Sequence, residues 1–363
     1  MVDCCEGDTF KLVQDYYGKV LENSGNLKTS ACTAASAPPP RIRQILGKIP
    51  GEVLEKFYGC GAPLPEGIQG LRVLDLGSGS GRDCYAAAAL VGESGTVTGV
   101  DMTSEQLEVA ERHASDFCKE QLGYKQSNMR FVKGHIEFLD KAGIQDDSLD
   151  IIISNCVVNL SPDKHRVLSE AYRVLAAGGE MYFSDVYSDR RMPKEAQEHE
   201  VLWGECISGA LYTGDFKAIC HQVGFADPRQ ISINEITIQD PELKSITGNA
   251  RFFSITYRLF KVPGMLEPAC EDYGQFAIYK GTIPGQKHAY QLDDGHNFVT
   301  GKPVLVCGNS AAMVGEQGKS WLSRHFQVTG DRSVHYGAFP CGLATAPSPS
   351  AAKPSAVGGS CCG

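Results

Sequence analysis

Three cysteines of this 363-residue chain stand where a sulfur atom could do chemistry. Cys156 follows the apolar run DIIISN at 150–155, Cys60 lies between two glycines in KFYGCGAPLPEG, and Cys206 follows a glycine and an acid in VLWGECISGALY. A glycine-flanked loop offers a thiol little core to pack into, whereas a cysteine after apolar residues is most often a core residue. Cys60 and Cys206 therefore suggest reactive thiols, and Cys156 stays open between packing and chemistry.

A second chemical feature is the glycine-rich stretch VLDLGSGSGRD at 73–83, between a strand and a helix. Gly77, Gly79 and Gly81 let the backbone approach a ligand closely, and the following helix presents its amide end. The spacing is G-x-G-x-G rather than the dinucleotide pattern G-x-G-x-x-G, and Asp75 precedes it. An acid there would repel a pyrophosphate but would accept a hydrogen bond from the ammonium of an amino-acid-bearing ligand. The alternative is an ordinary strand-to-helix turn.

Two further strand ends complete a candidate cofactor site. Asp101 ends the second strand, and its two carboxylate oxygens suit the two hydroxyls of a ribose. The loop GHIE at 134–137 follows the third strand, and we expect Ile136 to pack on an adenine ring. We also expect Tyr58, Met102, Glu137 and Asn155 in this site.

The elements that must position these residues alternate between apolar strands and helical segments. Almost continuously apolar strands separated by helices form a parallel sheet covered on both faces. We therefore expect an α/β fold with a doubly wound, Rossmann-like sheet, whose ligands bind at the carboxyl ends of the strands. The expected strands are 71–76, 96–101, 129–134, 150–155 and 180–185.

Short polar and glycine signals predict where the helices begin and end. Thr103 with Gln106 predicts a capping box after the second strand, and Ser161 with Pro162 predicts the start of a later helix. Gly178-Gly179 is expected to end that later helix.

The second half of the chain predicts an extension of the sheet. A helix at 214–223 closed by Gly224 is followed by strand-like runs at 229–238 and 251–260, which we expect to add an antiparallel pair. Shorter runs at 275–280 and 297–306 predict a smaller, appended β-rich unit. We expect an N-terminal helix and flexible arm at 1–40, a cofactor-binding domain at 41–205, a substrate domain at 206–285, a C-terminal domain at 286–345 and a disordered tail at 346–363.

Composition limits the classes of partner. The net charge is −9 and Lys and Arg form no cluster, which argues against a nucleic acid or an anionic membrane as partner. No apolar run approaches the roughly 20 residues of a membrane span, and the acidic start MVDCCEGDTF is unlike a signal peptide. Fourteen cysteines without a Cys-x-x-Cys pair are expected to be thiols in the cytoplasm rather than a zinc ribbon. No feature specifies an oligomer, and we expect a monomer.

The order of acid and glycine loop, ribose acid and adenine loop over 71–260 resembles the class I S-adenosylmethionine-dependent methyltransferases. In combination, seven motifs resemble more specifically those of the arsenite S-adenosylmethionine methyltransferases. This resemblance covers about residues 10–280, and the match after about 285 is weak. The motifs are YYG (16–18), YGCG (58–61), LDLGSGSGRDCY (74–85), SNCVVNLSPDK (154–164), EAYRVL (170–175), YFSDVY (182–187) and LWGEC (202–206).

This resemblance implies that S-adenosylmethionine methylates trivalent arsenic held by Cys60, Cys156 and Cys206, and that Cys32 forms a disulfide with Cys60. It also implies arsenite and methylarsenite as substrates, with glutathione or thioredoxin as the thiol reductant. Thiolates are natural ligands of a soft ion such as trivalent arsenic. Arsenic held by three sulfurs presents a lone pair as nucleophile and carries no proton, so no catalytic base is needed.

Two other functions stay open from the sequence. The acceptor could be an organic carbon or oxygen, or the protein could sequester thiophilic metals without catalysis. Among the remaining cysteines we expect Cys84, Cys118 and Cys220 to be packing residues. The pairs Cys4-Cys5 and Cys361-Cys362 either capture arsenite or are tolerated tail sequence, and Cys270, Cys307 and Cys341 lack a decisive context.

Overall fold

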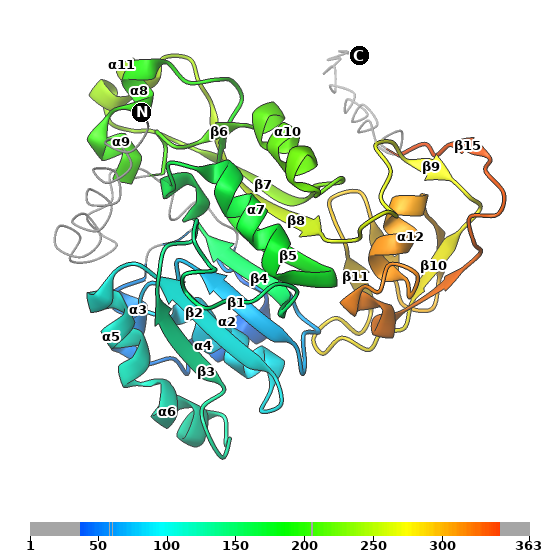
Figure 1. Ribbon diagram of the computed structural model, residues 1–363, viewed down its shortest axis with the longest axis horizontal. Helices are drawn as coiled ribbons and strands as arrows, with labels where there is room; N and C mark the ends of the chain where they lie inside the picture. Colours follow the sequence, from blue (N-terminus) through cyan, green and yellow to red (C-terminus); the bar gives the residue numbers. More distant parts are fainter. Residues whose placement is uncertain (1–36, 58, 60, 205, 342–363) are drawn as a thin grey trace, which may run out of the picture.

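The centre of the molecule is an eight-stranded sheet (Figure 1). The computed structural model describes residues 37–341 except 58, 60 and 205. The strand order is β3-β2-β1-β4-β5-β8-β7, and β6 pairs with β5. The strands are β1 Arg72–Leu76, β2 Thr96–Asp101, β3 Met129–Lys133, β4 Leu149–Asn155, β5 Leu175–Ser188, β6 Leu211–Tyr212, β7 Arg229–Ile236 and β8 Phe252–Phe260.

Strands β1 to β6 form only parallel pairs with one another, whereas β8 is antiparallel to both β5 and β7. The doubly wound sheet and its antiparallel extension are therefore confirmed. The chain runs outward from β1 to β3 and then returns to place β4 against β1. This reversal of strand order opens a crevice at the carboxyl ends of β1 and β4, where ligands of such sheets bind.

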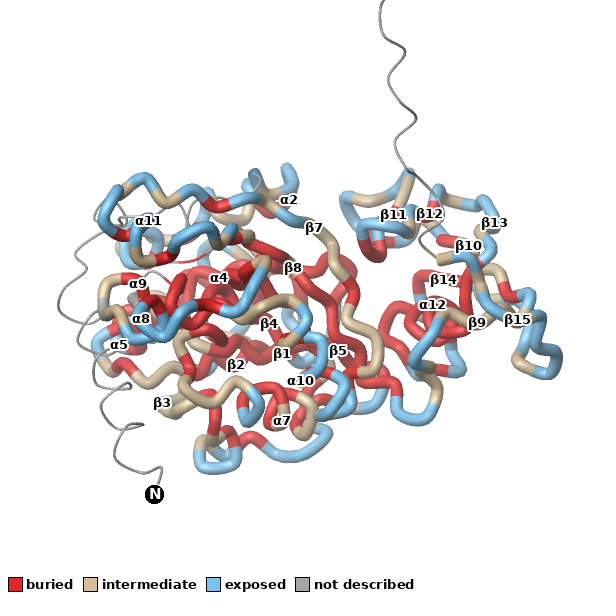
Figure 2. The backbone as a smooth tube through the Cα atoms, turned by 90° about the horizontal axis from the view of Figure 1, so that it is seen from above, coloured by how far each residue is buried: buried red, intermediate tan, exposed pale blue. Residues whose placement is uncertain are grey.

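Successive side chains of a strand point to opposite faces of the sheet. Both faces of this sheet carry apolar side chains, and helices cover both. Val73 and Ile153 pack on the face covered by α4, and Leu74 and Ile152 pack on the face covered by α7. Figure 2 shows the strands between these layers as the most continuously buried part of the chain. The helices are α2 Pro40–Leu46, α3 Gly51–Glu55, α4 Arg82–Val91, α5 Ser104–Arg112, α6 Ala114–Asp116, η3 Phe117–Gln121, η4 Val158–Leu160, α7 Lys164–Val174, α8 Lys194–Gln197, α9 Glu200–Gly204, α10 Thr213–Val223, α11 Pro241–Thr247, α12 Gly308–Val314 and η5 Trp321–His325.

A smaller β-rich unit follows β8, as expected (Figure 1). It contains the sheets β13-β10-β14, β11-β12 and β15-β9 together with α12. Its apolar core is continuous with the α4 face of the central sheet. The strands are β9 Glu271–Asp272, β10 Phe276–Tyr279, β11 Ala289–Gln291, β12 Asn297–Val299, β13 Pro303–Leu305, β14 Phe326–Thr329 and β15 Gly337–Ala338.

Two expected helix starts differ in detail. Thr103 is the N-cap of α5, but its side chain makes no capping hydrogen bond. The cap of α7 is Asp163 rather than Ser161, since the Asp163 carboxylate accepts a hydrogen bond from the Arg166 amide at 2.9 Å. The Ser161 hydroxyl donates instead to Glu137. Local competition between neighbouring polar side chains decides which of them caps a helix.

The prediction that Gly178-Gly179 ends α7 is wrong. The helix ends at Val174 and both glycines lie inside β5. Gly178 has a φ of 86°, and a Cβ atom on it would lie 1.9 Å from the carbonyl oxygen of Lys319. Glycine is required here because the appended unit approaches the strand, not because a helix stops.

Helix α10 ends at the left-handed Gly224, as expected. Strands β7 and β8 belong to the central sheet, so part of the expected substrate domain shares a sheet with the cofactor-binding domain. The domain boundaries themselves remain a prediction. The N-terminal helix and arm up to residue 36 and the tail after 341 lie outside the described residues. No described helix is both long and apolar enough to cross a membrane.

Candidate active site

A cleft opens at the carboxyl ends of β1, β2 and β4. Its walls come from segments far apart in the sequence, which the parallel sheet brings to one edge. The residues that we expected in a cofactor site and that line this cleft are Asp75, Gly77, Gly79, Asp101, Met102, Ile136, Glu137 and Asn155, together with Cys156.

The glycine loop connects β1 to α4 and lies against Val157. The amides of Gly77 and Ser78 donate to the carbonyl of Val100, at 2.8 and 3.1 Å, which ties the loop to β2. A Cβ atom on Gly77 would lie 2.4 Å from Cγ1 of Val157, and Gly77 has a φ of 68°. Only glycine therefore allows this approach. Gly81 is not in the cleft wall: it caps α4 and packs against Ala110.

Asp101 holds the loop from the neighbouring strand. Its Oδ2 accepts a hydrogen bond from the Gly79 amide at 2.9 Å, and its Oδ1 accepts one from the Thr103 amide at 2.8 Å. Burial raises the pKa of Asp101 above its usual value. Each carboxylate oxygen has two lone pairs, so both can accept a further hydrogen bond from a ligand in the cleft.

Two buried carboxylates face the cleft together. Burial, and then the negative charge of Asp83, raise the pKa of Asp75 well above its usual value. Asp83 accepts hydrogen bonds from Asn155 Nδ2 at 2.8 Å and from Arg82 Nε at 2.9 Å. A cationic group between these carboxylates would offset their repulsion. The sequence reasoning did not select Asp83, although an acid directly after a glycine loop was a visible signal.

Two buried polar atoms of the cleft wall have no hydrogen-bond partner within the described part of the chain. They are Ser78 Oγ and Asn155 Oδ1. Buried polar atoms are nearly always hydrogen-bonded, so such atoms in a cleft wall are fitted to a polar ligand. These atoms, the paired acids and Asp101 fit an adenosine-bearing, amino-acid-bearing cofactor.

Cys156 and Cys206 meet next to this cleft. The Cys206 thiol donates to the carbonyl oxygen of Cys156 at 3.2 Å, and the exposed fractions of the two residues are 0% and 4%. They share an apolar cluster with Val186 and Leu202. Cys156 has a φ of 58° and Cys206 a φ of 62°. Residues with a side chain rarely adopt this left-handed conformation, and such strain concentrates at functional sites.

Cys60 lies outside the described residues, as do Cys32 and Tyr58. The two residues that flank Cys60 lie against Asn155, which precedes Cys156. Gly61 O accepts a hydrogen bond from Asn155 Nδ2 at 3.2 Å, and a Cβ atom on Gly59 would lie 2.8 Å from the Asn155 side-chain carbon.

Seven of the described cysteines are thiols: Cys84, Cys118, Cys206, Cys220, Cys270, Cys307 and Cys341. Cys220 is a buried packing residue of α10, as expected. Cys84 does more than pack, because its thiol donates to Asp75 Oδ2 at 3.3 Å. Cys118 is buried and lies within hydrogen-bonding distance of the Asn128 side chain.

Two ionisable side chains near the cysteine pair have unusual pKa values. Burial lowers the pKa of Lys164 to about 8, an effect that the negative charges of Asp185 and of an ionised Cys206 oppose. Burial raises the pKa of Asp185 to about 7. The Asp185 carboxylate accepts hydrogen bonds from the amides of Val186 at 2.8 Å and Asn159 at 3.1 Å. The sequence reasoning had not selected Lys164 or Asp185.

The sheet, its glycine loop and the acid that ends β2 define a class I S-adenosylmethionine-dependent methyltransferase. Residues 69–224 match the family described as "Methyltransferase domain". The solved structure of CrArsM, an arsenic(III) S-adenosylmethionine methyltransferase from Chlamydomonas reinhardtii, is 63% identical with a TM-score of 0.81, covering 84% of this chain and 100% of that one.

Relatives that match most of the chain identify its family within this class. The arsenite methyltransferase of Aquipseudomonas alcaligenes is 53% identical over 91% of this chain and 94% of its own length. The arsenite methyltransferase of Homo sapiens is 46% identical over 84% of this chain and 80% of its own length. The chain belongs to the arsenite methyltransferase family.

Proposed function

We propose that the protein transfers the methyl group of S-adenosylmethionine to trivalent arsenic held by the thiolates of Cys60, Cys156 and Cys206. The observation that carries this proposal is the contact of Cys206 Sγ with the Cys156 carbonyl, beside a cleft built for an adenosine-bearing ligand. The position of Gly59 and Gly61 against Asn155 supports Cys60 as the third ligand.

The cleft residues hold and orient the methyl donor, which supplies a methyl group on a positively charged sulfur. Asp101 accepts hydrogen bonds from the ribose hydroxyls, and Ile136 packs on the adenine. Asp75 and Asp83 receive the ammonium group, whose positive charge relieves the repulsion that raises the pKa of Asp75. Met102, Glu137 and Asn155 complete the walls.

The thiolates hold arsenic and leave its lone pair on the opposite side. Arsenic bound by three sulfurs has no proton to lose, so Asp185 does not have to act as a base. The protonated Lys164 lies close enough to Cys206 to favour the thiolate form of that sulfur. Catalysis then comes mainly from orienting the two reactants.

A thiol reductant is part of the same proposal. A sulfur in a disulfide cannot bind arsenite as a thiolate, so the proposed arsenic ligands must be kept reduced. Glutathione or thioredoxin would supply this reduction, with exchange between Cys32 and Cys60 as a step. The products are methylated arsenicals, and methylarsenite is a further substrate. The described thiols suit a reducing compartment, so we propose that the protein is cytoplasmic. We also propose that it is a monomer.

The test is arsenic speciation after incubation of the purified protein with arsenite, S-adenosylmethionine and a thiol. Cys156→Ser and Cys206→Ser should each reduce methylated arsenic at least about 100-fold, because a serine hydroxyl is a hard, weak ligand for arsenic. Cys220→Ser, which removes a buried thiol away from the cleft, should keep activity within about threefold.

A methyltransferase with an organic acceptor would keep its activity in both cysteine variants. A metal-sequestering protein would yield no methylated arsenic at all and would not retain labelled S-adenosylmethionine in equilibrium dialysis. Either result would exclude the proposed reaction.

A further inference from the structure

The appended unit brings together three cysteines that the proposed reaction does not use. The Sγ atoms of Cys270, Cys307 and Cys341 all lie within 4.8 Å of one another. Cys270 directly precedes β9, Cys341 lies beyond the end of β15, and Cys307 is the N-cap of α12. Figure 1 places β9, β15 and α12 in the appended unit, away from the strand ends that form the cleft.

The backbone holds these cysteines in place. The pairing of β9 with β15 continues outward through a hydrogen bond from the Phe339 amide to the Cys270 carbonyl at 2.8 Å. The Cys341 amide donates to the Phe339 carbonyl at 2.7 Å, which turns the chain back toward Cys270. Cys307 reaches the same point from α12, so the group needs no large rearrangement to share a ligand.

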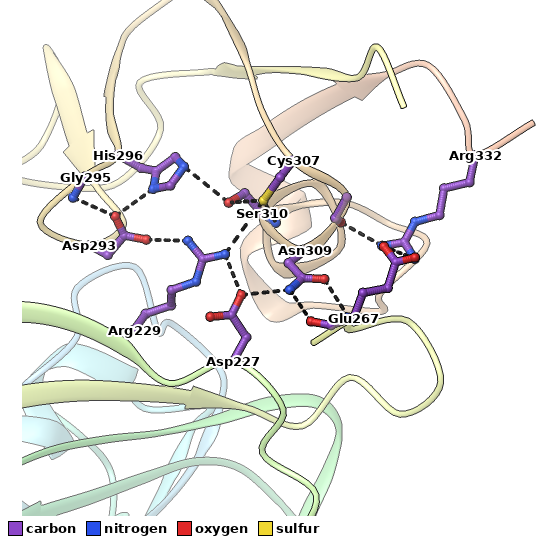
Figure 3. A network of polar contacts seen from close by, with 11 residues as sticks. Asp227, Arg229, Glu267, Asp293, Gly295, His296, Cys307, Asn309, Ser310 and Arg332 are labelled. Atoms are coloured by element: carbon purple, nitrogen blue, oxygen red, sulfur yellow. Dashed lines mark hydrogen bonds and ion pairs between the residues drawn. The ribbon is translucent and has the colours of Figure 1, made fainter. Parts of the chain in front are cut away.

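Polar groups contact the side chain of Cys307 (Figure 3). Its sulfur accepts a hydrogen bond from the Ser310 amide at 3.4 Å, and Arg229 approaches the sulfur at 3.9 Å. Arg229 is itself fixed by Asp227 at 2.7 Å and by Asp293 at 2.9 Å. These contacts, including the N-cap contact with the Ser310 amide, fix the position of the Cys307 sulfur beside Cys270 and Cys341.

The distances suit one small thiophilic atom. Bonds from thiolate to a metal ion are about 2.3 Å long, so sulfurs around one ion lie about 3.8 Å apart. Sulfurs within 4.8 Å of one another reach that separation by shifts of about 1 Å or less. Cys270 and Cys341 are only half-buried, which leaves an approach from solvent.

The number of ligands selects the kind of ion. Among the described residues, no histidine or carboxylate joins the three sulfurs within the same distance. A structural zinc ion requires four ligands, whereas trivalent arsenic is satisfied by three sulfurs in a pyramid. We propose that Cys270, Cys307 and Cys341 form a second binding site for trivalent arsenic.

Binding at this site changes no oxidation state. Three As–S bonds replace the three As–O bonds of arsenous acid, and the three thiol protons leave with the hydroxyl groups as three water molecules. No methyl donor takes part, so this site can hold arsenic whether or not the cleft methylates it.

The experiment uses the full-length chain under reducing conditions. In a parent variant, serine replaces every cysteine except this trio and the buried Cys84, Cys118 and Cys220. After arsenite is added and unbound arsenic removed, mass spectrometry measures arsenic per chain and X-ray absorption counts sulfur neighbours. The parent should retain one arsenic with three sulfurs.

Cys341→Ser in the parent should abolish the three-sulfur arsenic signal and weaken arsenite binding at least about tenfold. This residue is half-buried, so the variant should fold, which circular dichroism verifies. The matched control is Cys118→Ser, which also removes one thiol but leaves the trio intact.

Three results would overturn the second site: a parent that retains no arsenic, retention that Cys341→Ser leaves unchanged, or a four-coordinate zinc ion that arsenite does not displace. Because the readout is binding in a parent without the cleft thiols, none of these results bears on methylation.

Discussion

Cys156 and Cys206 hold a backbone conformation that residues with a side chain avoid. The left-handed region costs about 1–2 kcal/mol per residue, so the surrounding structure must compensate for both. The apolar cluster that buries the two residues supplies this support. Strain is thus held where the Cys206 sulfur contacts the Cys156 backbone, between two segments distant in the sequence.

Asp101→Ala should weaken binding of S-adenosylmethionine about 10–100-fold, because it removes the one or two charge-assisted hydrogen bonds that we propose Asp101 accepts from the ribose. Affinity for arsenite should remain, since the thiols occupy a different part of the site. Tryptophan fluorescence titrations with each ligand measure both affinities. A comparable loss of both would contradict this separation.

The raised pKa of Asp185 predicts that the stability of the protein depends on pH. This pKa rises from 3.8 to about 7 on folding, so between these values the folded state binds more protons. The resulting stabilisation is present at low pH and is lost as the pH rises through 7. Relative to Asp185→Asn, the natural protein should lose about 3 kcal/mol of unfolding free energy between pH 5 and pH 8.

Urea unfolding at several pH values measures this difference. The exposed Glu195→Gln serves as the control and should leave the pH dependence of the natural protein unchanged. The quantity compared is the free energy of unfolding of the natural protein minus that of Asp185→Asn. If this difference stayed constant from pH 5 to pH 8, the pKa of Asp185 would not be raised.

At the scale of elements, the loop between β1 and α4 links the cofactor cleft to the cysteine pair. Gly77 packs on Val157, and Val157 directly follows Cys156. A change at Gly77 should therefore disturb the cofactor cleft directly and the cysteine pair through the contact with Val157.

Gly77→Ala should impair methyl transfer at least about tenfold, because the added methyl group must displace Val157. Gly92→Ala is the matched control: Gly92 also has a positive φ, of 74°, but a Cβ atom there meets nothing within 4 Å. Both variants carry backbone strain, so the difference between them isolates the collision. Arsenic speciation measures activity, and equal activities would show that the Val157 contact is unimportant.

At the scale of the whole molecule, Arg258 joins the central sheet to the appended unit. It forms a buried ion pair with Glu180 of β5 at 2.8 Å and donates to the Tyr290 hydroxyl at 2.8 Å and the Leu292 carbonyl at 3.2 Å. This single side chain satisfies polar groups of both units inside a shared core.

Arg258→Met should lower the free energy of unfolding by about 3–5 kcal/mol, because it leaves the Glu180 carboxylate buried without its partner. Adding Glu180→Leu should recover much of this loss. The control is Arg251→Met, whose ion pair with Glu235 is exposed, screened by solvent and should contribute little to stability. Urea denaturation measures all three; a loss below about 1 kcal/mol for Arg258→Met would refute the bridging role.

The sequence by itself predicted the strands of the central sheet except β6, the glycine loop, and the positions of Asp75 and Asp101 on their strands, because these features are local. Apolar runs, glycine spacing and an acid at a strand end are read from neighbouring residues, and the parallel sheet then brings them to one edge. The sequence predicted helix starts less well where neighbouring polar residues, such as Ser161 and Asp163, compete to cap the helix.

Only the tertiary structure decided the other contacts between distant segments. The family resemblance implied that Cys156 and Cys206 lie together, and the structure shows their contact. The burial that shifts the pKa of Asp185 and the grouping of Cys270 with Cys307 and Cys341 depend on how remote segments pack. Spacing along the chain carries no information about such contacts, because they arise when separate strands and loops share one core.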